Sequence, residues 1–261
     1  MSLGPLRPKR ELGQHFLADP NILEVAGRLA ALAPEDVVLE VGAGLGVLTR
    51  YLADRVGHVH AVELDRSLET ELRAALGPSA NVELVFGDAL RLPLSALDPP
   101  PGKLVANLPY QIATPLLVES LDGLPTVELW TVMVQREVAD RLFADPGTRA
   151  YGAVSVLVRL TAERTGFHPV ARTVFRPPPN VDSALVAFRR TRAWGEEYPP
   201  LKRLVQAAFA HRRKTLANSL ELSGIATRAE AGEALRRIGR EPGSRAEALA
   251  PEEFAALSEA L

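Results

Sequence analysis

The chain has 261 residues, of which 47 % are hydrophobic and 24 % charged, and a net charge of −2, a composition typical of a globular protein with one or two domains. It contains no cysteine, which excludes disulfides, thiolate metal sites and a cysteine nucleophile. No apolar run reaches the roughly 18 residues of a membrane span, and residues 1–16 lack the apolar segment of a signal peptide, so we expect a cytoplasmic protein without membrane contact.

Predicted strands and helices alternate from residue 36 to residue 143. Residues 36–53 contain an apolar strand, a glycine-rich turn and a stretch with helical spacing. Further strands are predicted over residues 58–65, 81–90, 103–108 and 127–135, and further helices over residues 67–76, 114–124 and 136–143. In the helix over 114–124, Thr114 is the predicted N-cap and Pro115 occupies the first position. The alternation predicts an α/β fold with a mostly parallel sheet and helices on both faces.

The last third of the chain has a different pattern. Residues 166–190 have strand-like ends around three consecutive prolines at 177–179. Because proline fits neither a helix interior nor a central strand, this segment predicts a rigid loop. From Pro199 onward the apolar spacing is helical. We place a boundary near residues 190–198, which predicts a first domain over 1–190 and a small all-helical domain over 191–261.

The small net charge conceals a basic band. From Arg189 to Leu216 the sequence has eight basic residues against two acidic ones, Glu196 and Glu197. Such a band is typical of a surface that contacts an anionic partner. A solvated charged face would have the same composition, so charge alone leaves both interpretations open.

The glycine-rich turn and two acids predict a nucleoside-binding site. Gly42, Gly44 and Gly46 follow the first strand with the spacing G-x-G-x-G, and glycine permits a sharp turn and the close approach of a ligand. Glu63 ends the second strand, where an acid can accept both ribose hydroxyls, and Asp88 ends the third, where a carboxylate can hold an adenine amino group. No Lys-Ser/Thr pair follows the turn, which excludes a P-loop. An adenosine with a non-phosphate tail, such as S-adenosylmethionine, fits best.

The fourth predicted strand ends in Asn107, Leu108, Pro109 and Tyr110, next to the expected cleft. Pro109 biases Leu108 towards an extended conformation, which leaves the Leu108 carbonyl free to point into the cleft beside the Asn107 side-chain oxygen. Two such acceptors would hold an exocyclic amine, with Tyr110 stacked on the ring that bears it. This corner predicts an aminopurine whose amine attacks an electrophilic methyl group, with alignment and electrostatics in place of a catalytic base.

Seven motifs in order resemble those of the bacterial 16S ribosomal RNA adenine dimethyltransferases of the kasugamycin-sensitivity type, which have archaeal and eukaryotic counterparts. They are LGQHFL (12–17), EVGAGLG (40–46), VELD (62–65), GDAL (87–90), NLPY (107–110), FRPPPNVDSALV (175–186) and AFAHRRKTLANSL (208–220). The resemblance runs from about Arg10 to the C-terminus and implies a Rossmann-like class I methyltransferase that uses S-adenosylmethionine. The implied target is the N6 amines of two adjacent adenines in the 3′-terminal hairpin of 16S rRNA, during assembly of the small ribosomal subunit.

The resemblance also implies contacts with the cofactor. These are expected at His15, Leu17, Gly42, Gly44, Glu63, Asp88 and Asn107. The family usually has Asn in place of His15, whose imidazole can still donate a hydrogen bond towards the methionine end of the cofactor.

Residues for the RNA are implied in the same way. Phe175 would stack on the target adenine opposite Tyr110, whereas without the resemblance a core phenylalanine is the better interpretation. A second group would bind phosphates and consists of Arg212, Arg213 and Lys214. The apolar spacing places this group on the first helix of the small domain.

Three alternatives share some of these features. An erythromycin-resistance 23S rRNA methylase has the same cofactor site, but its corner more often reads Asn-Ile-Pro-Tyr and it lacks the motifs at 175–186 and 208–220. A non-catalytic ribosome assembly factor would keep the fold, but the intact Glu63, Asp88 and corner argue against lost catalysis. An NAD(P)-dependent oxidoreductase is disfavoured by the glycine spacing and the corner. We expect a monomer without a metal site.

Overall fold

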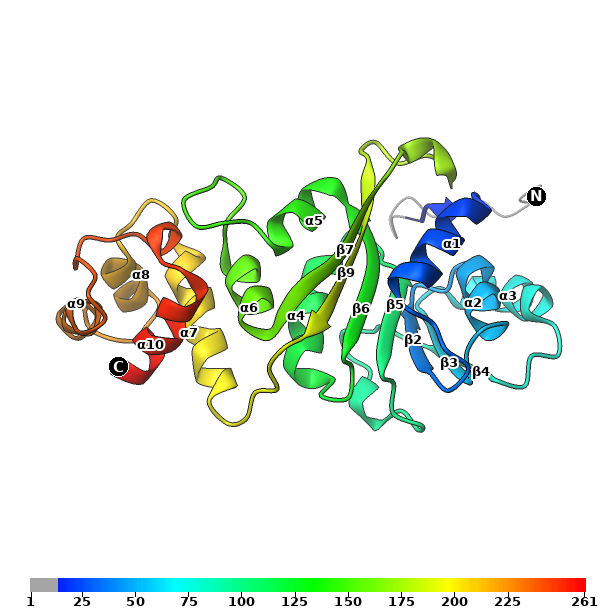
Figure 1. Ribbon diagram of the computed structural model, residues 1–261, viewed down its shortest axis with the longest axis horizontal. Coiled ribbons are helices and arrows are strands. Elements are labelled where there is room, and N and C mark those ends of the chain that lie inside the picture. The colour runs from blue at the N-terminus through cyan, green and yellow to red at the C-terminus, as the bar shows by residue number, and fades with distance from the viewer. Residues whose placement is uncertain (1–13) are drawn as a thin grey trace. The chain divides into compact units, whose positions relative to one another are not determined.

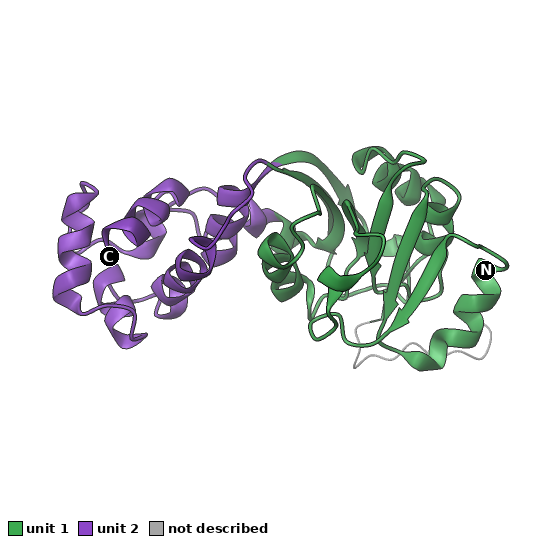
Figure 2. Ribbon diagram, turned by 90° about the horizontal axis from the view of Figure 1, so that it is seen from below, with its two compact units in different colours: residues 1–139, 164–190 green, residues 140–163, 191–261 purple. Residues whose placement is uncertain are grey.

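The computed structural model describes residues 14–261. Within it the chain forms two compact units (Figure 2), one that ends at residue 139 and resumes over 164–190, and one made of residues 140–163 and 191–261. The second unit thus includes residues 140–163, which the sequence-based division had assigned to the first domain. The division into domains over 1–190 and 191–261 stays a prediction.

A seven-stranded sheet forms the centre of the first unit among the described residues, in the order β4-β3-β2-β5-β6-β9-β7. Its strands are β2 (Val37–Val41), β3 (His58–Glu63), β4 (Val82–Phe86), β5 (Lys103–Asn107), β6 (Leu129–Gln135), β7 (Ala162–Val170) and β9 (Ser183–Arg190). The pairs β2–β3, β3–β4, β2–β5 and β5–β6 are parallel, and β9 is antiparallel to β6. The predicted α/β fold with a mostly parallel sheet is therefore confirmed.

Helices cover both faces of this sheet (Figure 1), with α4 and α5 on the side away from α1 and α2. They are α1 (Pro20–Leu29), α2 (Val47–Ala53), α3 (Glu69–Leu76), α4 (Ala113–Gly123) and α5 (Arg136–Leu142). The sequence analysis assigned no element to α1, although Asp19 caps it by accepting the Asn21 N–H at 2.9 Å and Pro20 opens its first turn.

The start of α4 differs from the prediction. Thr114 is not the N-cap, because the helix begins at Ala113 after Ile112, which already has helical backbone angles. The Ile112 N–H donates to the Pro109 carbonyl at 3.1 Å, and the Leu116 N–H donates to the Ile112 carbonyl at 2.9 Å. The chain therefore enters the helix directly from the corner at 107–110, and Thr114 lies in the first turn.

A two-stranded antiparallel ribbon holds the first described residues against a much later segment. It pairs β1 (Phe16–Leu17) with β8 (Phe175–Arg176), with Leu17 opposite Phe175. The Ala18 N–H donates to the Val174 carbonyl at 2.9 Å and extends the contact. The ribbon is anchored in the core because the Phe175 side chain is completely buried there.

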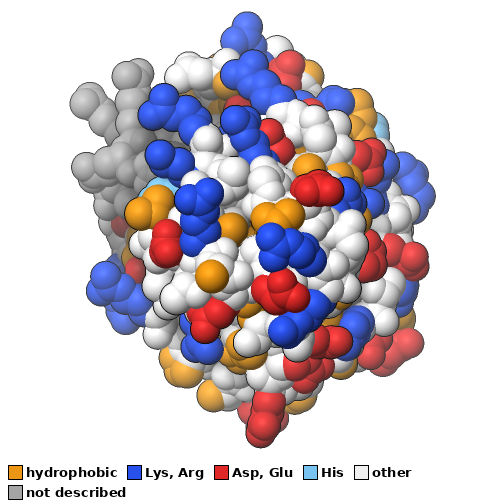
Figure 3. Space-filling model, turned by 90° about the vertical axis from the view of Figure 1, so that its left-hand side faces the viewer, with side chains coloured by type: hydrophobic (Ala, Val, Ile, Leu, Met, Phe, Trp, Pro, Cys, Tyr) orange, Lys and Arg blue, Asp and Glu red, His pale blue; other side chains and the backbone are white. Residues whose placement is uncertain are grey.

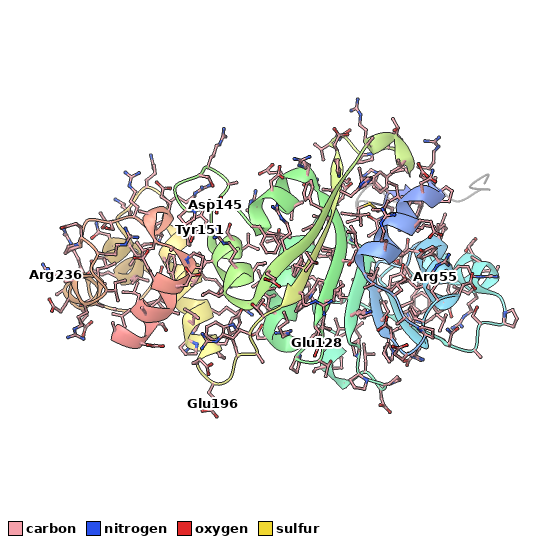
Figure 4. The ribbon with its side chains drawn as sticks, viewed as in Figure 1. Arg55, Glu128, Asp145, Tyr151, Glu196 and Arg236 are labelled. Atoms are coloured by element: carbon pink, nitrogen blue, oxygen red, sulfur yellow. The ribbon has the colours of Figure 1, made fainter. Side chains whose placement is uncertain are left out.

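The second unit is helical, as the predicted small domain was. It contains α6 (Ala153–Thr161), α7 (Tyr198–Ala210), α8 (Leu216–Leu222), α9 (Arg228–Arg237) and α10 (Pro251–Ala260). Buried Tyr151, labelled in Figure 4, donates to the Leu249 carbonyl at 2.7 Å, which ties the segment before α6 to the segment before α10. No helix in residues 14–261 is long and apolar enough to cross a membrane.

The residues Arg212, Arg213 and Lys214 do not lie on a helix, contrary to the prediction. α7 ends at Ala210, and α8 begins at Leu216 with Thr215 as its N-cap, whose hydroxyl accepts the Asn218 N–H at 3.4 Å. We call the connecting segment 211–215 the basic turn. An N-capping threonine needs extended backbone angles, and Thr215 has them, so one continuous helix is excluded.

Candidate active site

A pocket opens at the carboxyl ends of β2, β3 and β5, where a parallel sheet places its ligands. The ribbon strand β1, the turn after β2 and the corner at 107–110 form its walls. It brings together ten of the predicted site residues, namely His15, Leu17, Gly42, Gly44, Glu63, Asp88, Asn107, Leu108, Pro109 and Tyr110. Groups that are far apart in the sequence therefore meet around one cavity.

The glycine-rich turn is shaped for a close ligand. Gly42 and Gly44 have φ angles of +85° and +57°, a backbone region in which a side chain is strained. A Cβ atom on Gly42 would lie 3.0 Å from Cδ of Pro109, and one on Gly44 would lie 3.1 Å from the Phe16 ring. Glycine at these two positions thus keeps the turn clear of the corner and of β1.

Glu63 connects the turn to the end of β3. Its carboxylate accepts the Gly44 N–H at 2.8 Å and the Asp65 N–H at 2.8 Å. Each carboxylate oxygen has a second lone pair, so Glu63 can hold the turn and still accept hydrogen bonds from a ligand. Asp88 accepts the Leu90 N–H at 3.0 Å and lies 3.4 Å from the Arg91 guanidinium.

A third acid, Glu40, lies in β2 and is not among the residues that line the pocket. Glu40 is buried in β2, and burial raises its pKa to about 8, against the effect of the Thr49 hydroxyl and with a smaller contribution from the Glu63 charge. At neutral pH the Glu40 carboxyl therefore keeps its proton. The sequence analysis missed this residue because its position within an apolar strand carries no sign of its protonation.

The corner at 107–110 contains the Asn107 amide oxygen and the Leu108 carbonyl, the two acceptors that the sequence analysis expects to face the cleft, and their direction stays a prediction. The Asn107 amide nitrogen donates to the His15 carbonyl at 3.2 Å, which directs the amide oxygen to a different side. The Leu108 N–H donates to the Met133 carbonyl at 3.1 Å and continues the β5–β6 ladder. No donor to the Asn107 amide oxygen or to the Leu108 carbonyl is found within residues 14–261.

Tyr110 and His15 are held as a pair beside these acceptors. Their ring centroids lie 5.7 Å apart with an interplanar angle of 30°. The Tyr110 hydroxyl shares a hydrogen bond of 2.6 Å with the Ser183 hydroxyl. Burial raises the pKa of Tyr110, against the effect of this hydrogen bond, so the ring stays a neutral phenol. The sequence analysis missed Ser183, which lies opposite Gln135 at the end of β6 and carries no sign of this contact in the sequence.

The hydrogen bond of His15 differs from the one that the resemblance implied. Its Nδ1 lies 2.8 Å from the Pro177 carbonyl oxygen, which can only accept, so Nδ1 carries the proton. In the neutral ring the remaining nitrogen, Nε2, is then an acceptor. His15 therefore donates to the proline loop rather than towards the pocket.

Phe175 is not brought to the pocket. Its side chain is fully buried in the core of the first unit, opposite Leu17 in the ribbon. In this conformation its ring is unavailable to a base, which favours the alternative interpretation as a core phenylalanine. Its stacking role stays a prediction.

The basic band also divides into two kinds of residue. Arg190 donates to the carbonyls of Leu121, Leu124 and Val127 and lies 4.9 Å from the centre of the Trp130 ring, so it stabilises the end of α4. Arg212, Arg213 and Lys214, the three cationic residues of the basic turn, are exposed. Figure 3 shows more basic side chains in the upper part of one face and more acidic ones in its lower part, with some of each kind in both.

Sequence comparisons identify relatives along nearly the whole chain. Residues 6–261 match the family described as ribosomal RNA adenine dimethylase. The ribosomal RNA small subunit methyltransferase A of Rubrobacter xylanophilus is 49 % identical over 251 residues, which are 96 % of this chain and 94 % of that protein. The protein of the same name from Geobacter metallireducens is 42 % identical over 266 residues, or 98 % and 96 % of the two chains.

Solved structures agree with this similarity. The 23S rRNA methyltransferase ErmE has a TM-score of 0.68 and 31 % identity, with 94 % of this chain and 99 % of that chain covered. A dimethyladenosine transferase from Plasmodium falciparum has a TM-score of 0.72 at 24 % identity, over 93 % and 96 % of the two chains, and shows the same Rossmann-like fold. The chain therefore belongs to the ribosomal RNA adenine dimethylase family, whose members use S-adenosylmethionine as methyl donor.

Proposed function

We propose that the protein dimethylates N6 of two adjacent adenines in the 3′-terminal hairpin of 16S rRNA, as a cytoplasmic monomer acting on a partly assembled small subunit. Membership of the family makes the chain an rRNA adenine dimethyltransferase. The small-subunit target is supported by the relatives that are 41–49 % identical, which are named ribosomal RNA small subunit methyltransferase A. The observation that carries the proposal is the corner, whose residues Asn107 and Leu108 line the pocket together with the glycine-rich turn and Glu63.

The residues that line the pocket fit the cofactor. The turn at Gly42 and Gly44 leaves room that a Cβ atom would fill, and Glu63 lies at the strand end where ribose hydroxyls are held. Asp88 would receive the adenine amino group, and Leu17 and the face of His15 would border the methionine end. When bound, S-adenosylmethionine supplies a methyl group that its sulfonium already activates.

The corner would orient the target amine. The Asn107 amide oxygen and the Leu108 carbonyl would accept its two hydrogens, which favours a tetrahedral nitrogen with its lone pair directed at the methyl group. Tyr110 would stack on the extruded base as a neutral ring. Because alignment lowers the barrier, no basic side chain is needed during the transfer. The methyl–sulfur bond breaks as the methyl–nitrogen bond forms, and the cationic nitrogen then loses its proton to water.

The helical unit would supply the attraction for RNA. Exposed arginine and lysine side chains bind phosphates without reading bases, and the basic turn presents three of them in succession. Selectivity would then come from the shape of the rRNA and from the single base that enters the pocket.

The test is methyl transfer from labelled S-adenosylmethionine to purified ribosomal subunits that lack the modification. We expect incorporation of four methyl groups into small subunits, two on each of two neighbouring adenines, and none into large subunits. Base mapping locates them. Incorporation into 23S rRNA instead would support the activity of the related ErmE-like methylases and reject the small-subunit target.

A further inference from the structure

Two histidines and a glutamate form a cluster near the amino-terminal ends of β3 and β4. His58 and His60 are two residues apart on β3, so their side chains share one face of the sheet. Glu83 on β4 is the register partner of His60 and projects from the same face. The cluster is distinct from the pocket, since Glu63 lies at the other end of β3, five residues or roughly 16 Å from His58.

The contact between His60 Nδ1 and the Glu83 carboxylate cannot be a hydrogen bond from a neutral imidazole. Its Nε2 lies 2.7 Å from the Pro99 carbonyl oxygen, which can only accept, so Nε2 carries a proton. Its Nδ1 lies 2.7 Å from the Glu83 carboxylate. A neutral imidazole would then direct a lone pair at a carboxylate, and two acceptors repel each other. A cation must lie between them, either a proton or a metal ion.

His58 distinguishes these two cations. Its Nε2 is buried from solvent and has no hydrogen-bond partner within the described part of the chain. The same nitrogen lies 4.0 Å from the Glu83 carboxylate oxygen that faces His60, and the two imidazole rings are 4.4 Å apart. A proton shared by His60 and Glu83 leaves the His58 nitrogen without a partner, whereas a metal ion would use its lone pair.

We propose that His58 Nε2, His60 Nδ1 and the Glu83 carboxylate bind a divalent first-row transition metal ion of the zinc class. The three ligand atoms lie within 4.8 Å of one another. With bonds of about 2.0–2.1 Å, tetrahedral zinc places its ligands about 3.3–3.4 Å apart. The observed separations of 2.7 Å and 4.0 Å from the Glu83 oxygen lie on either side of that value, so small rotamer shifts complete the site.

The surroundings agree with this ligand set. Two imidazoles favour zinc, nickel or copper over magnesium and calcium, which prefer oxygen ligands alone. The Pro99 carbonyl receives the other ring proton of His60, the outer contact that orients metal-bound histidines. Half of the Glu83 side chain is exposed, which gives an entry path and room for a water at the fourth position. The ion would join β3, β4 and the loop before β5, contrary to the expectation of no metal site.

The experiment uses the full chain without a histidine tag, stripped with a chelator. Zinc chloride is titrated in a calorimeter, and cobalt(II) serves as a spectroscopic probe of coordination. The variants are His58→Gln and Glu83→Gln, because His60 is fully buried and its replacement endangers the fold. His168→Gln, which changes a half-buried histidine on another strand, is the matched control. S-adenosylmethionine binding verifies that each variant is folded.

We expect one zinc ion per chain in the wild type and in His168→Gln, at least tenfold weaker binding in the other two variants, and loss of their four-coordinate cobalt absorption. Zinc should also raise the thermal midpoint of the wild type but not that of Glu83→Gln. The proposal is overturned if the wild type takes up no zinc at micromolar concentrations, or if His58→Gln and Glu83→Gln bind it as well as the wild type. The cluster is then a half-exposed hydrogen bond between His60 and Glu83 that involves no metal ion.

Discussion

The corner at 107–110 and the basic turn at 211–215 are built in opposite ways. Asn107 and Tyr110 are each fixed by hydrogen bonds to distant segments, at His15 and Ser183, and Leu108 is buried between them. Arg212, Arg213 and Lys214 of the basic turn are exposed, and the hydrogen bond from Arg212 to the Arg149 carbonyl is exposed as well. A group that aligns a reacting atom needs fixed geometry, whereas phosphate attraction acts over several ångströms and tolerates movement.

The largest effect is expected at Phe175, which is buried in the core of the first unit, close in the chain to the proline loop. Phe175→Ala should lower the free energy of unfolding by about 3–5 kcal/mol, because it removes a fully buried ring. Urea denaturation measures this loss. Phe175→Leu retains most of the volume, should cost less than about 1.5 kcal/mol, and should methylate at nearly the wild-type rate. A stable leucine variant that has lost methyl transfer would instead support stacking on the target base.

The next largest effect is expected at the corner. Asn107→Ala should reduce single-turnover methyl transfer by about 100-fold, since the amine is no longer aligned, while cofactor affinity largely persists. Calorimetry and single-turnover kinetics separate the two quantities. A near-normal rate in this variant would contradict the alignment role.

A third change tests the turn that the corner faces. Glu63→Ala should weaken S-adenosylmethionine binding by about 1–3 kcal/mol, because a carboxylate that holds the Gly44 N–H and the ribose is lost. Glu63→Gln keeps one carbonyl oxygen as an acceptor, so its loss of binding free energy for S-adenosylmethionine should be smaller. Equal affinities in wild type and Glu63→Ala would remove this residue from the site.

The smallest effect on chemistry is expected at the basic turn. Replacing Arg212, Arg213 and Lys214 by Gln should weaken RNA binding. The slope of the logarithm of the binding constant against the logarithm of the salt concentration should become less steep, by up to about 0.9 per lost phosphate contact. Cofactor affinity should not change. The charge-matched control replaces the exposed Arg228, Arg236 and Arg237 of α9 by Gln; Arg236 is labelled in Figure 4. Normal methylation at raised salt by the basic-turn variant would show that this turn does not dock RNA.

The sequence predicted those parts of the fold that local patterns determine. The strands before Gly42, Glu63 and Asn107 are marked by apolar runs that end in turns, and the structure has β2, β3 and β5 there. Helix α6 was missed, because its sequence AVSVLVRLT is rich in β-branched residues and forms a helix only through burial of most of its side chains. The helix boundary at Thr114 was wrong because the chain enters α4 directly from the corner without a capping side chain. The boundary in the basic turn was wrong because Thr215 caps α8.

The candidate site was predictable as far as residues follow strand ends. Contacts between distant segments were not, since spacing in the sequence does not show that Ser183 meets Tyr110 or that His15 uses its ring proton on Pro177. The sequence also does not show which side chains are buried. Phe175 was therefore expected in the site, whereas its side chain lies in the core. The resemblance identified the residue types but not their hydrogen-bond partners.

The ribbon between β1 and β8 has a consequence for the order in which the protein is made. The ribosome synthesises the residues of β1 first, yet the Pro177 carbonyl that holds His15 follows 162 positions later. Until β8 has left the exit tunnel, β1 has no strand to pair with, and one wall of the pocket lacks its support. The nascent chain therefore completes its methyl-donor pocket only after β8 and the proline loop have been synthesised.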